Sequence, residues 1–382
     1  MTCRLFPALG AVLLLSCLAC AGFDTQPLPP GEPVAETTVR LDDVLQPIRK
    51  KYDLPAVGGA IFDSSGRLLA VGAVGQRYLG SGDGPSEPVT VQDRWHLGSD
   101  TKAMTATLVA LAVERGELSF DTPVSEFMPE ADPAWQAVTM KHLLSHTAGV
   151  TDGFPTKFIV MKYRYGFERA AEGRALWMAD LVSEPPSGEL GTYAYSNLGY
   201  ILAGHLLERQ QERPWEELIT MQLFVPLGMT ASGFGPPRGS HPWGHGEFGS
   251  DLSGITPSIH ADNAGALGPA GTVHATLSDW AKFGALHLSA ARGQPELVSG
   301  EVFTTLHTPV ERGYALGWGA VEDDDFGGAW ILSHSGSNMF WYARIVLVPD
   351  HDRGYLFVTN TARNGGEGAE ETIRALAAVE IP

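Results

Sequence analysis

The sequence of 382 residues is long enough for two domains, or for one large two-lobed unit with a sizeable core. Its hydrophobic content of 44% and charged content of 18% are typical of a folded protein and exclude a disordered or fibrous one. The formal net charge of -18 repels nucleic-acid phosphates and anionic lipid head groups, so we expect no nucleic-acid partner.

Residues 1–21 are predicted to be a signal peptide. Arg4 supplies a short positive region, and Leu5 to Ala19 is a largely apolar run that carries no charge. Such a run is shorter than the roughly 20 residues of a membrane-spanning helix and is typical of the core of a secretory signal. No later apolar run is long enough to cross a membrane. We therefore expect an exported protein.

All three cysteines, Cys3, Cys17 and Cys20, lie in this segment, so we expect no disulfide in the mature protein. Leu14 to Cys17 is similar to a bacterial lipoprotein box, and Cys20 is a poorer match because Cys17 stands where an aliphatic residue is preferred. Ala19-Cys20-Ala21 also suits ordinary signal peptidase. We favour a periplasmic lipoprotein anchored at Cys17 or Cys20, with soluble secretion left open.

Residues 22–40 are rich in proline and poor in apolar side chains, which predicts a flexible tether. A helix is predicted over Leu41 to Tyr52, where apolar residues share one face. Two apolar runs, Ala56 to Phe62 and Leu68 to Val74, flank a short polar turn and predict a β-hairpin.

The middle of the chain reads as mostly helical. Thr101 to Glu114 is apolar on nearly every side, which predicts a buried helix. Helices are also predicted over Gly199 to Arg209, Trp215 to Val225 and Ser278 to Leu288. Gly233 to Thr272, dense in glycine, proline and histidine, is predicted to be a long loop.

Strand patterns return near the end, at Ala329 to Ser333, Phe340 to Val348 and Gly354 to Thr359, before a terminal helix over Ala369 to Val379. Strands at both ends with helices between them predict an α+β fold. We expect one antiparallel sheet, flanked by helices and built from the N- and C-terminal segments, with a mostly helical lobe inserted.

The catalytic domain is predicted to span residues 41–382. Its α/β lobe would comprise about 41–98 and 310–382, and its helical lobe about 99–309. An active site is expected in the cleft between the lobes.

One serine in the chain is followed by lysine three positions later, in Ser99-Asp100-Thr101-Lys102. Positions i and i+3 share one face of a helix, so the amine can reach the hydroxyl. A serine hydroxyl is a weak nucleophile that needs an adjacent base, and burial lowers the pKa of a lysine enough to serve as one. This spacing alone would also fit a serine that caps the helix beside an exposed lysine with no catalytic role.

Two further motifs follow in order, Tyr195-Ser196-Asn197 and His334-Ser335-Gly336. With them, the chain resembles the serine β-lactamase and penicillin-binding superfamily, in the class C-like branch that includes esterases and D-amino-acid peptidases. The resemblance runs from about Leu41 to about Asn360 and includes flanking stretches such as His142 to Gly149 and Tyr314 to Trp318. It implies a β-lactamase/transpeptidase-like fold.

The resemblance also implies roles for individual residues. Ser99 would form an acyl-enzyme, while Lys102 and the Tyr195 oxygen would share its proton and pass it to the leaving group. Asn197 would hydrogen-bond Lys102 or the substrate amide. The oxyanion would lie between the backbone N–H groups of Ser99 and Ser337. Gly336 would belong to the substrate-binding strand, and no cofactor or metal is implied.

His334 departs from the lysine that β-lactamases and penicillin-binding proteins usually place there to hold a substrate carboxylate. A histidine is largely neutral at pH 7, so that clamp would be weaker. We therefore expect an exported serine hydrolase of carboxylesterase or D-stereospecific peptidase type, acting on a small-molecule or peptide-like substrate. Two alternatives stay open: a β-lactamase or DD-carboxypeptidase, and a non-catalytic relative that binds peptidoglycan or a β-lactam.

The remaining histidines offer no paired ligands on a rigid element, so we predict no metal site. His241, His245, His260 and His274 are expected to pack loops or line the cleft. His146 is expected to brace its loop rather than to act in the cleft.

Overall fold

The computed structural model describes residues 38–80, 82–152, 155–248 and 251–382. The predicted signal peptide, its three cysteines and nearly all of the predicted tether lie outside these residues. Within the described ranges, no helix combines the length and the apolar character needed to cross a membrane.

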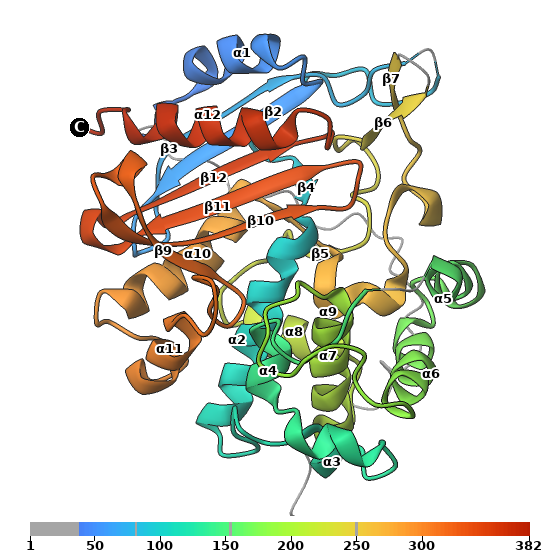
Figure 1. Cartoon of the computed structure of the whole chain (residues 1–382). Coiled ribbons are helices and arrows are strands. Elements are labelled where there is room, and N and C mark those ends of the chain that lie inside the picture. The colour runs from blue at the N-terminus through green and yellow to red at the C-terminus, as the bar shows by residue number, and fades with distance from the viewer. Residues whose placement is uncertain (1–37, 81, 153–154, 249–250) are drawn as a thin grey trace, which may run out of the picture.

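A seven-stranded sheet joins the two ends of the described chain (Figure 1). Its strand order is β1-β3-β2-β12-β11-β10-β9, with β1 parallel to β3 and every other neighbouring pair antiparallel. Pairing of β2 with β12 joins the N-terminal hairpin to the C-terminal strands, which confirms the predicted α+β architecture. The strands are β1 (Val39–Arg40), β2 (Ala56–Phe62), β3 (Leu68–Gly75), β9 (Gly319–Asp323), β10 (Ala329–Ser337), β11 (Tyr342–Val348) and β12 (Arg353–Thr359).

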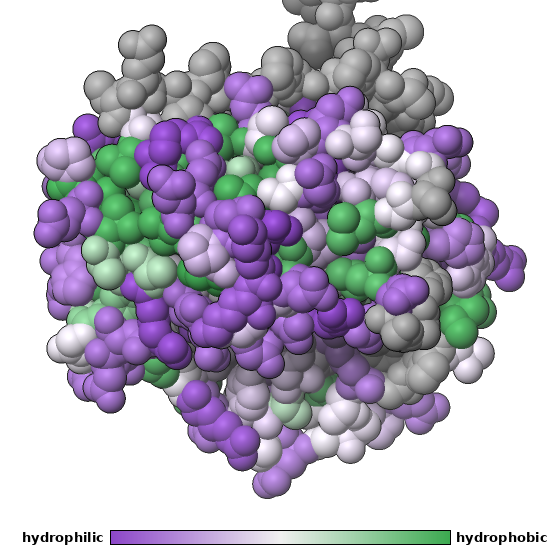
Figure 2. Space-filling model, turned by 90° about the horizontal axis from the view of Figure 1, so that it is seen from above, coloured by the Kyte–Doolittle hydropathy of each residue, from purple (hydrophilic) through white to green (hydrophobic). Residues whose placement is uncertain are grey.

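Helices cover both faces of this sheet (Figure 1). On one face lie α1 (Asp42–Lys51) and α12 (Gly365–Ala377), and on the other lies α10 (Leu277–Ala291). Alternation along β11 follows from the strand period of two: Ile345 and Leu347 join the large core, whereas Val346 joins the smaller core beneath α1 and α12. Figure 2 looks down on this end of the molecule and shows a mostly hydrophilic surface with smaller hydrophobic areas.

The helical part of the chain surrounds α2 (Thr101–Glu114), which contacts α7, α9 and α11. Its first twelve residues are all buried, as its apolar sequence predicts. The other helices are α3 (Val124–Phe127), α4 (Met140–Leu144), α5 (Pro155–Val160), α6 (Ala170–Val182), α7 (Asn197–Gln211), α8 (Trp215–Ile219), α9 (Gly268–Gly271) and α11 (Gly300–His307).

A buried ion-pair cluster ties three of these helices together. Arg174 of α6 is fully buried and pairs with Glu208 of α7 at 2.5 Å and with Glu216 of α8 at 2.9 Å. Burial alone would raise the pKa of Glu208, but the Arg174 guanidinium holds it at about 2. The Arg174–Glu208 pair therefore stays charged at neutral pH, and the cluster positions α7 and α8 relative to α6.

Two predictions of local structure are wrong. The segment Gly233 to Thr272 is not one long loop, because it contains the strands β5 (Gly233–Phe234), β6 (His245–Phe248) and β7 (Asp251–Gly254) as well as α9. These strands are too short to show a hydrophobic period. The strand predicted from Phe340 begins only at Tyr342, because the Asn338 side chain accepts hydrogen bonds from the backbone of Phe340 and Trp341 and turns the chain there.

Candidate active site

Ser99 lies in a tight turn, η1 (Gly98–Asp100), between the short strand β4 (Arg94–His96) and α2. Gly98 has a φ of 53°, and a Cβ at this position would lie 2.4 Å from the backbone nitrogen of Ser337. A Cβ on Gly336 would likewise lie 2.6 Å from the backbone nitrogen of Ser99. Both positions therefore need glycine, and their absent side chains let the turn and the end of β10 approach closely.

Lys102 is fully buried and lies one helical turn from Ser99, as the spacing predicts. Its Nζ lies 3.0 Å from Ser99 Oγ, 2.7 Å from Asn197 Oδ1 and 2.7 Å from the backbone oxygen of Ala270. Burial lowers its pKa from the ordinary 10.5 to about 7.

These three contacts match what a neutral amine can make. It can donate one hydrogen bond to the Asn197 amide oxygen and one to the Ala270 carbonyl, which leaves its lone pair for the Ser99 hydroxyl. The arrangement can therefore accept a proton from Ser99, which is the chemistry of a general base.

Tyr195 lies beside both residues. Its ring centroid is 4.9 Å from Lys102 Nζ, and, against the larger effect of burial, the nearby Ser99 side chain lowers the pKa of Tyr195. Although 42% of the residue is exposed, burial of the hydroxyl raises the pKa of Tyr195 above its ordinary value. The phenol is therefore protonated at neutral pH, and Lys102 is the more easily deprotonated of the two partners of Ser99.

Asn197 bridges the lysine and a residue that sequence reasoning missed. Its Nδ2 donates to Asp152 Oδ2 at 2.7 Å, while its Oδ1 faces Lys102. Asp152 precedes its partners by 44 to 46 residues and belongs to none of the three motifs, so no spacing pattern marked it.

His334 is buried and makes two hydrogen bonds. Its Nδ1 lies 3.0 Å from the backbone oxygen of Ser335, to which it can donate, and its Nε2 lies 3.1 Å from the Tyr314 hydroxyl, from which it then accepts. Burial, with a smaller effect of nearby Lys102, lowers the pKa of His334 to about 3. The residue is neutral at pH 7, as predicted, and offers a substrate carboxylate no positive charge.

His146 braces the loop that carries the tyrosine. Its Nδ1 accepts the backbone N–H of Ser196 at 3.0 Å, and its ring lies 4.3 Å from the Tyr195 ring, centroid to centroid. Elsewhere, His245 and His274 are buried, and their rings make hydrogen bonds with backbone groups of neighbouring loops. Within the described part of the chain, no group of three His, Cys, Asp or Glu side chains could hold a metal ion.

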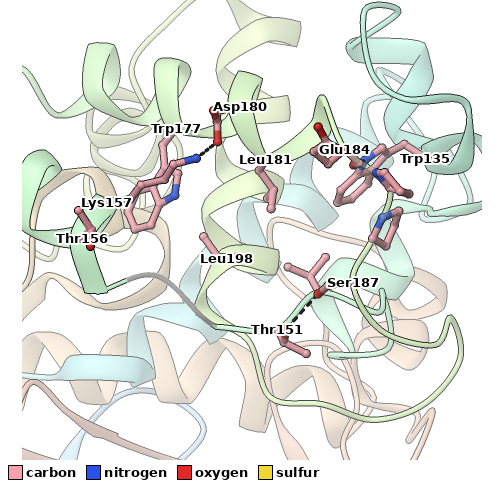
Figure 3. A pocket seen from close by; sticks show the side chains of 13 residues that line it. Trp135, Thr151, Thr156, Lys157, Trp177, Asp180, Leu181, Glu184, Ser187 and Leu198 are labelled. Carbon is pink, nitrogen blue, oxygen red and sulfur yellow. Dashed lines mark hydrogen bonds and ion pairs between the residues drawn. The ribbon is translucent and has the colours of Figure 1, made fainter.

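A cavity of about 480 Å³ lies beside this site, between α5, α6 and the start of α7 (Figure 3). Its apolar walls include Trp135, Trp177 and Leu181, and its rim carries an ion pair between Lys157 and Asp180. Ser99 is not among the lining residues. Among the residues that the structure describes, the cavity meets the site at Thr151 and Leu198, the chain neighbours of Asp152 and Asn197. It therefore lies behind the hydrogen bonds that join Asp152, Asn197 and Lys102, and it is separate from Ser99.

Comparison with protein families adds a match over nearly the whole described chain. A family model described as Beta-lactamase matches residues 41–380. Lovastatin esterase of Penicillium rubens is 27% identical over 238 residues, which are 57% of this chain and 56% of that protein. Penicillin-binding protein 4 of Amycolatopsis lactamdurans is 26% identical over 371 residues, 88% of this chain and 89% of that protein. The chain thus spans about half of the first relative and most of the second.

Solved structures share the fold. An octameric penicillin-binding protein homologue from Pyrococcus abyssi superposes with a TM-score of 0.73 at 22% identity, covering 88% of this chain and 75% of that chain. A class C beta lactamase from Rhodobacter sphaeroides gives a TM-score of 0.65 at 20% identity, covering 88% of this chain and 99% of that chain. At these identities the likeness concerns the fold alone.

Proposed function

The chain belongs to the beta-lactamase family of serine hydrolases, and we propose that it is an exported carboxylesterase or D-stereospecific peptidase acting through an acyl-enzyme on Ser99. The observation that carries this proposal is the buried Lys102 amine, 3.0 Å from Ser99 Oγ and with a pKa lowered to about 7. A lysine that is half neutral at physiological pH can act as a base, which an exposed lysine cannot.

The reaction begins when the Ser99 oxygen attacks the substrate carbonyl carbon and its proton passes to the neutral Lys102 amine. The new oxyanion lies between the backbone N–H groups of Ser99 and Ser337, and losing one such donor typically costs about 3 kcal/mol of transition-state stabilisation. Tyr195 gives its proton to the leaving oxygen or nitrogen and regains one from the lysine. Water then attacks the acyl-serine by the same proton transfers in reverse, which restores the Ser99 hydroxyl.

His334 supports the ranking of substrates. Its neutral, doubly hydrogen-bonded ring gives no charge to hold the carboxylate of a β-lactam or of a peptide C-terminus. An uncharged ester or amide needs no such clamp. The similarity to lovastatin esterase agrees with an ester substrate.

A DD-carboxypeptidase or β-lactamase activity is the second candidate, because the match to penicillin-binding protein 4 covers 88% of the chain. A relative that binds peptidoglycan or a β-lactam without turnover ranks below both, because Ser99, Lys102 and Tyr195 are all present and adjacent.

Export is the other part of the proposal. It is supported by the positively charged start and the apolar run of residues 1–21. Cys17 or Cys20 is the proposed site of a lipid anchor that would hold the protein to the membrane on its periplasmic side. Labelling with a lipid precursor, followed by mass analysis of the N-terminus, distinguishes a lipoprotein from a secreted protein.

A substrate panel tests the hydrolase proposal. Purified protein and its Ser99→Ala variant are assayed with short-chain esters, D- and L-amino-acid amides, and β-lactams. We expect hydrolysis of esters or D-amino-acid amides that is lost in the variant. Faster turnover of cephalosporins than of esters and amides would overturn the ranking, and activity that survives the substitution would overturn the nucleophile.

A further inference from the structure

Asp152 joins a loop that precedes α5 to the first turn of α7. Its carboxylate accepts four hydrogen bonds: from Ser196 Oγ at 2.9 Å, from the backbone of Asn197 at 2.9 Å, from Asn197 Nδ2 at 2.7 Å, and from the backbone of Leu198 at 3.1 Å. Every one of these donors belongs to the segment that carries the tyrosine and the asparagine of the site. A negative charge at this helix N-terminus also lies at the favourable end of the helix dipole.

The carboxylate fixes which way the Asn197 amide faces. Because Nδ2 donates to Asp152, Oδ1 must point the other way, where it meets Lys102 Nζ at 2.7 Å. Rotating the amide by 180° would set its oxygen against the carboxylate and its N–H groups against the amine, so both hydrogen bonds would be lost. The orientation of an otherwise freely turning amide is therefore set from outside the cleft.

Asp152 also acts on the lysine through its charge. Burial lowers the pKa of Lys102, and the Asp152 carboxylate is the largest opposing influence. Asp100 opposes burial as well, but it is itself buried and its own pKa is raised, which weakens its charge. The other titratable groups around the amine are uncharged at neutral pH: His146, His334, Tyr195 and Tyr200.

From this geometry we propose that Asp152 is a positioning residue for acyl transfer: it orients Asn197 and thereby holds the Lys102 amine against Ser99. The inference rests on the proposed function, since it concerns the same reaction. A plain helix cap is the competing explanation. However, Ser196 already caps the helix by accepting the N–H of Gly199, and a plain cap would not hold the Asn197 amide with its oxygen toward Lys102.

Two variants separate these explanations. Asp152→Asn removes the charge and leaves one acceptor oxygen for the N–H groups of α7, whereas Asp152→Ser shortens the side chain by one bond, so that all four hydrogen bonds are lost. Asp132→Asn is the matched control, because Asp132 also caps a turn, through the N–H of Ala134 at 2.9 Å, and contacts nothing in the site. Each protein is assayed for the acylation rate constant with p-nitrophenyl acetate from pH 5 to 9, and for thermal unfolding.

Misplacing a catalytic group by about 1 Å can cost on the order of 100-fold in rate. We expect both Asp152 variants to lose roughly 10- to 100-fold in kcat with little change in KM. The acidic limb of their pH profile should move to lower pH, because the charge that raises the pKa of Lys102 is gone. The control should keep the wild-type rate and profile.

The outcomes distinguish this inference from the proposed function. If the wild type forms no acyl-enzyme on Ser99, the proposed function fails. If the wild type acylates and the Asp152 variants match it within about twofold with an unmoved acidic limb, only the positioning role fails. A loss of stability with unchanged kinetics in the folded fraction would reduce Asp152 to a helix cap.

Discussion

Lowering the pH should switch off acylation as Lys102 gains a proton. Burial lowers the pKa of this amine from the ordinary 10.5 to about 7. At pH 7 about half of the molecules then carry a neutral amine, whereas an exposed lysine would leave roughly one in three thousand neutral. Since only the neutral amine can take the Ser99 proton, we expect kcat/KM to fall about tenfold per pH unit below about pH 6 and to level off above about pH 8.

Stopped-flow release of p-nitrophenol, followed at a wavelength where the phenol and phenolate absorb equally, measures this rate across the pH range. Circular dichroism at each pH checks that the protein stays folded. A rate that keeps climbing to about pH 10 would mean that Lys102 has an ordinary pKa, contrary to its burial. A rate that does not depend on pH would remove Lys102 as the base altogether.

Three further predictions concern stability and local geometry. Lys102→Met should raise the free energy of unfolding, and by more at pH 6 than at pH 9. The lowered pKa of Lys102 destabilises the folded state fully below about pH 7, and this penalty shrinks as the pH approaches 10.5. Urea unfolding at both pH values measures the gain, and a larger gain at pH 9 would contradict the prediction. Gly98→Ala should abolish turnover and cost about 1–3 kcal/mol of stability, because Gly98 has a φ of 53° and the new Cβ would press on the backbone of Ser337. A folded variant with wild-type turnover would contradict the need for glycine in this turn. Arg174→Met should cost about 3–5 kcal/mol, because it removes the cation that pairs with the buried Glu208 and the partly exposed Glu216. Arg169→Met, at an exposed pair, should change unfolding little, and equal losses in the two variants would contradict the buried cluster.

The strands of the sheet and the placement of Lys102 beside Ser99 were predictable because their signals are local. The hairpin strands and α2 have long, uninterrupted hydrophobic patterns, and the structure places α2 over Thr101–Glu114 as expected. The approach of Lys102 to Ser99 follows from helix geometry alone. The spacing could not show how deeply Lys102 is buried, because burial depends on the packing of the whole core. This burial lowers the pKa of the lysine.

Other features depend on contacts between distant segments, which one sequence does not reveal. Asp152 meets its partners only after the intervening helices fold back, so it has no local motif. The hydrogen bond between Tyr314 and His334 joins a loop to β10, and the burial that lowers the pKa of the histidine likewise comes from the packed structure. The short strands of the segment Gly233 to Thr272 are likewise held by pairing, as with β5 against β8 (Val273–Thr276), rather than by their own pattern.

The most direct test of the central claim is the mass of the intact protein after reaction with a fluorophosphonate. We expect a single covalent adduct, mapped by peptide sequencing to Ser99, that forms more slowly below about pH 6 as the base becomes protonated and is absent from Ser99→Ala. An adduct on another residue, or one that still forms in Ser99→Ala, would contradict the assignment of Ser99 as the nucleophile.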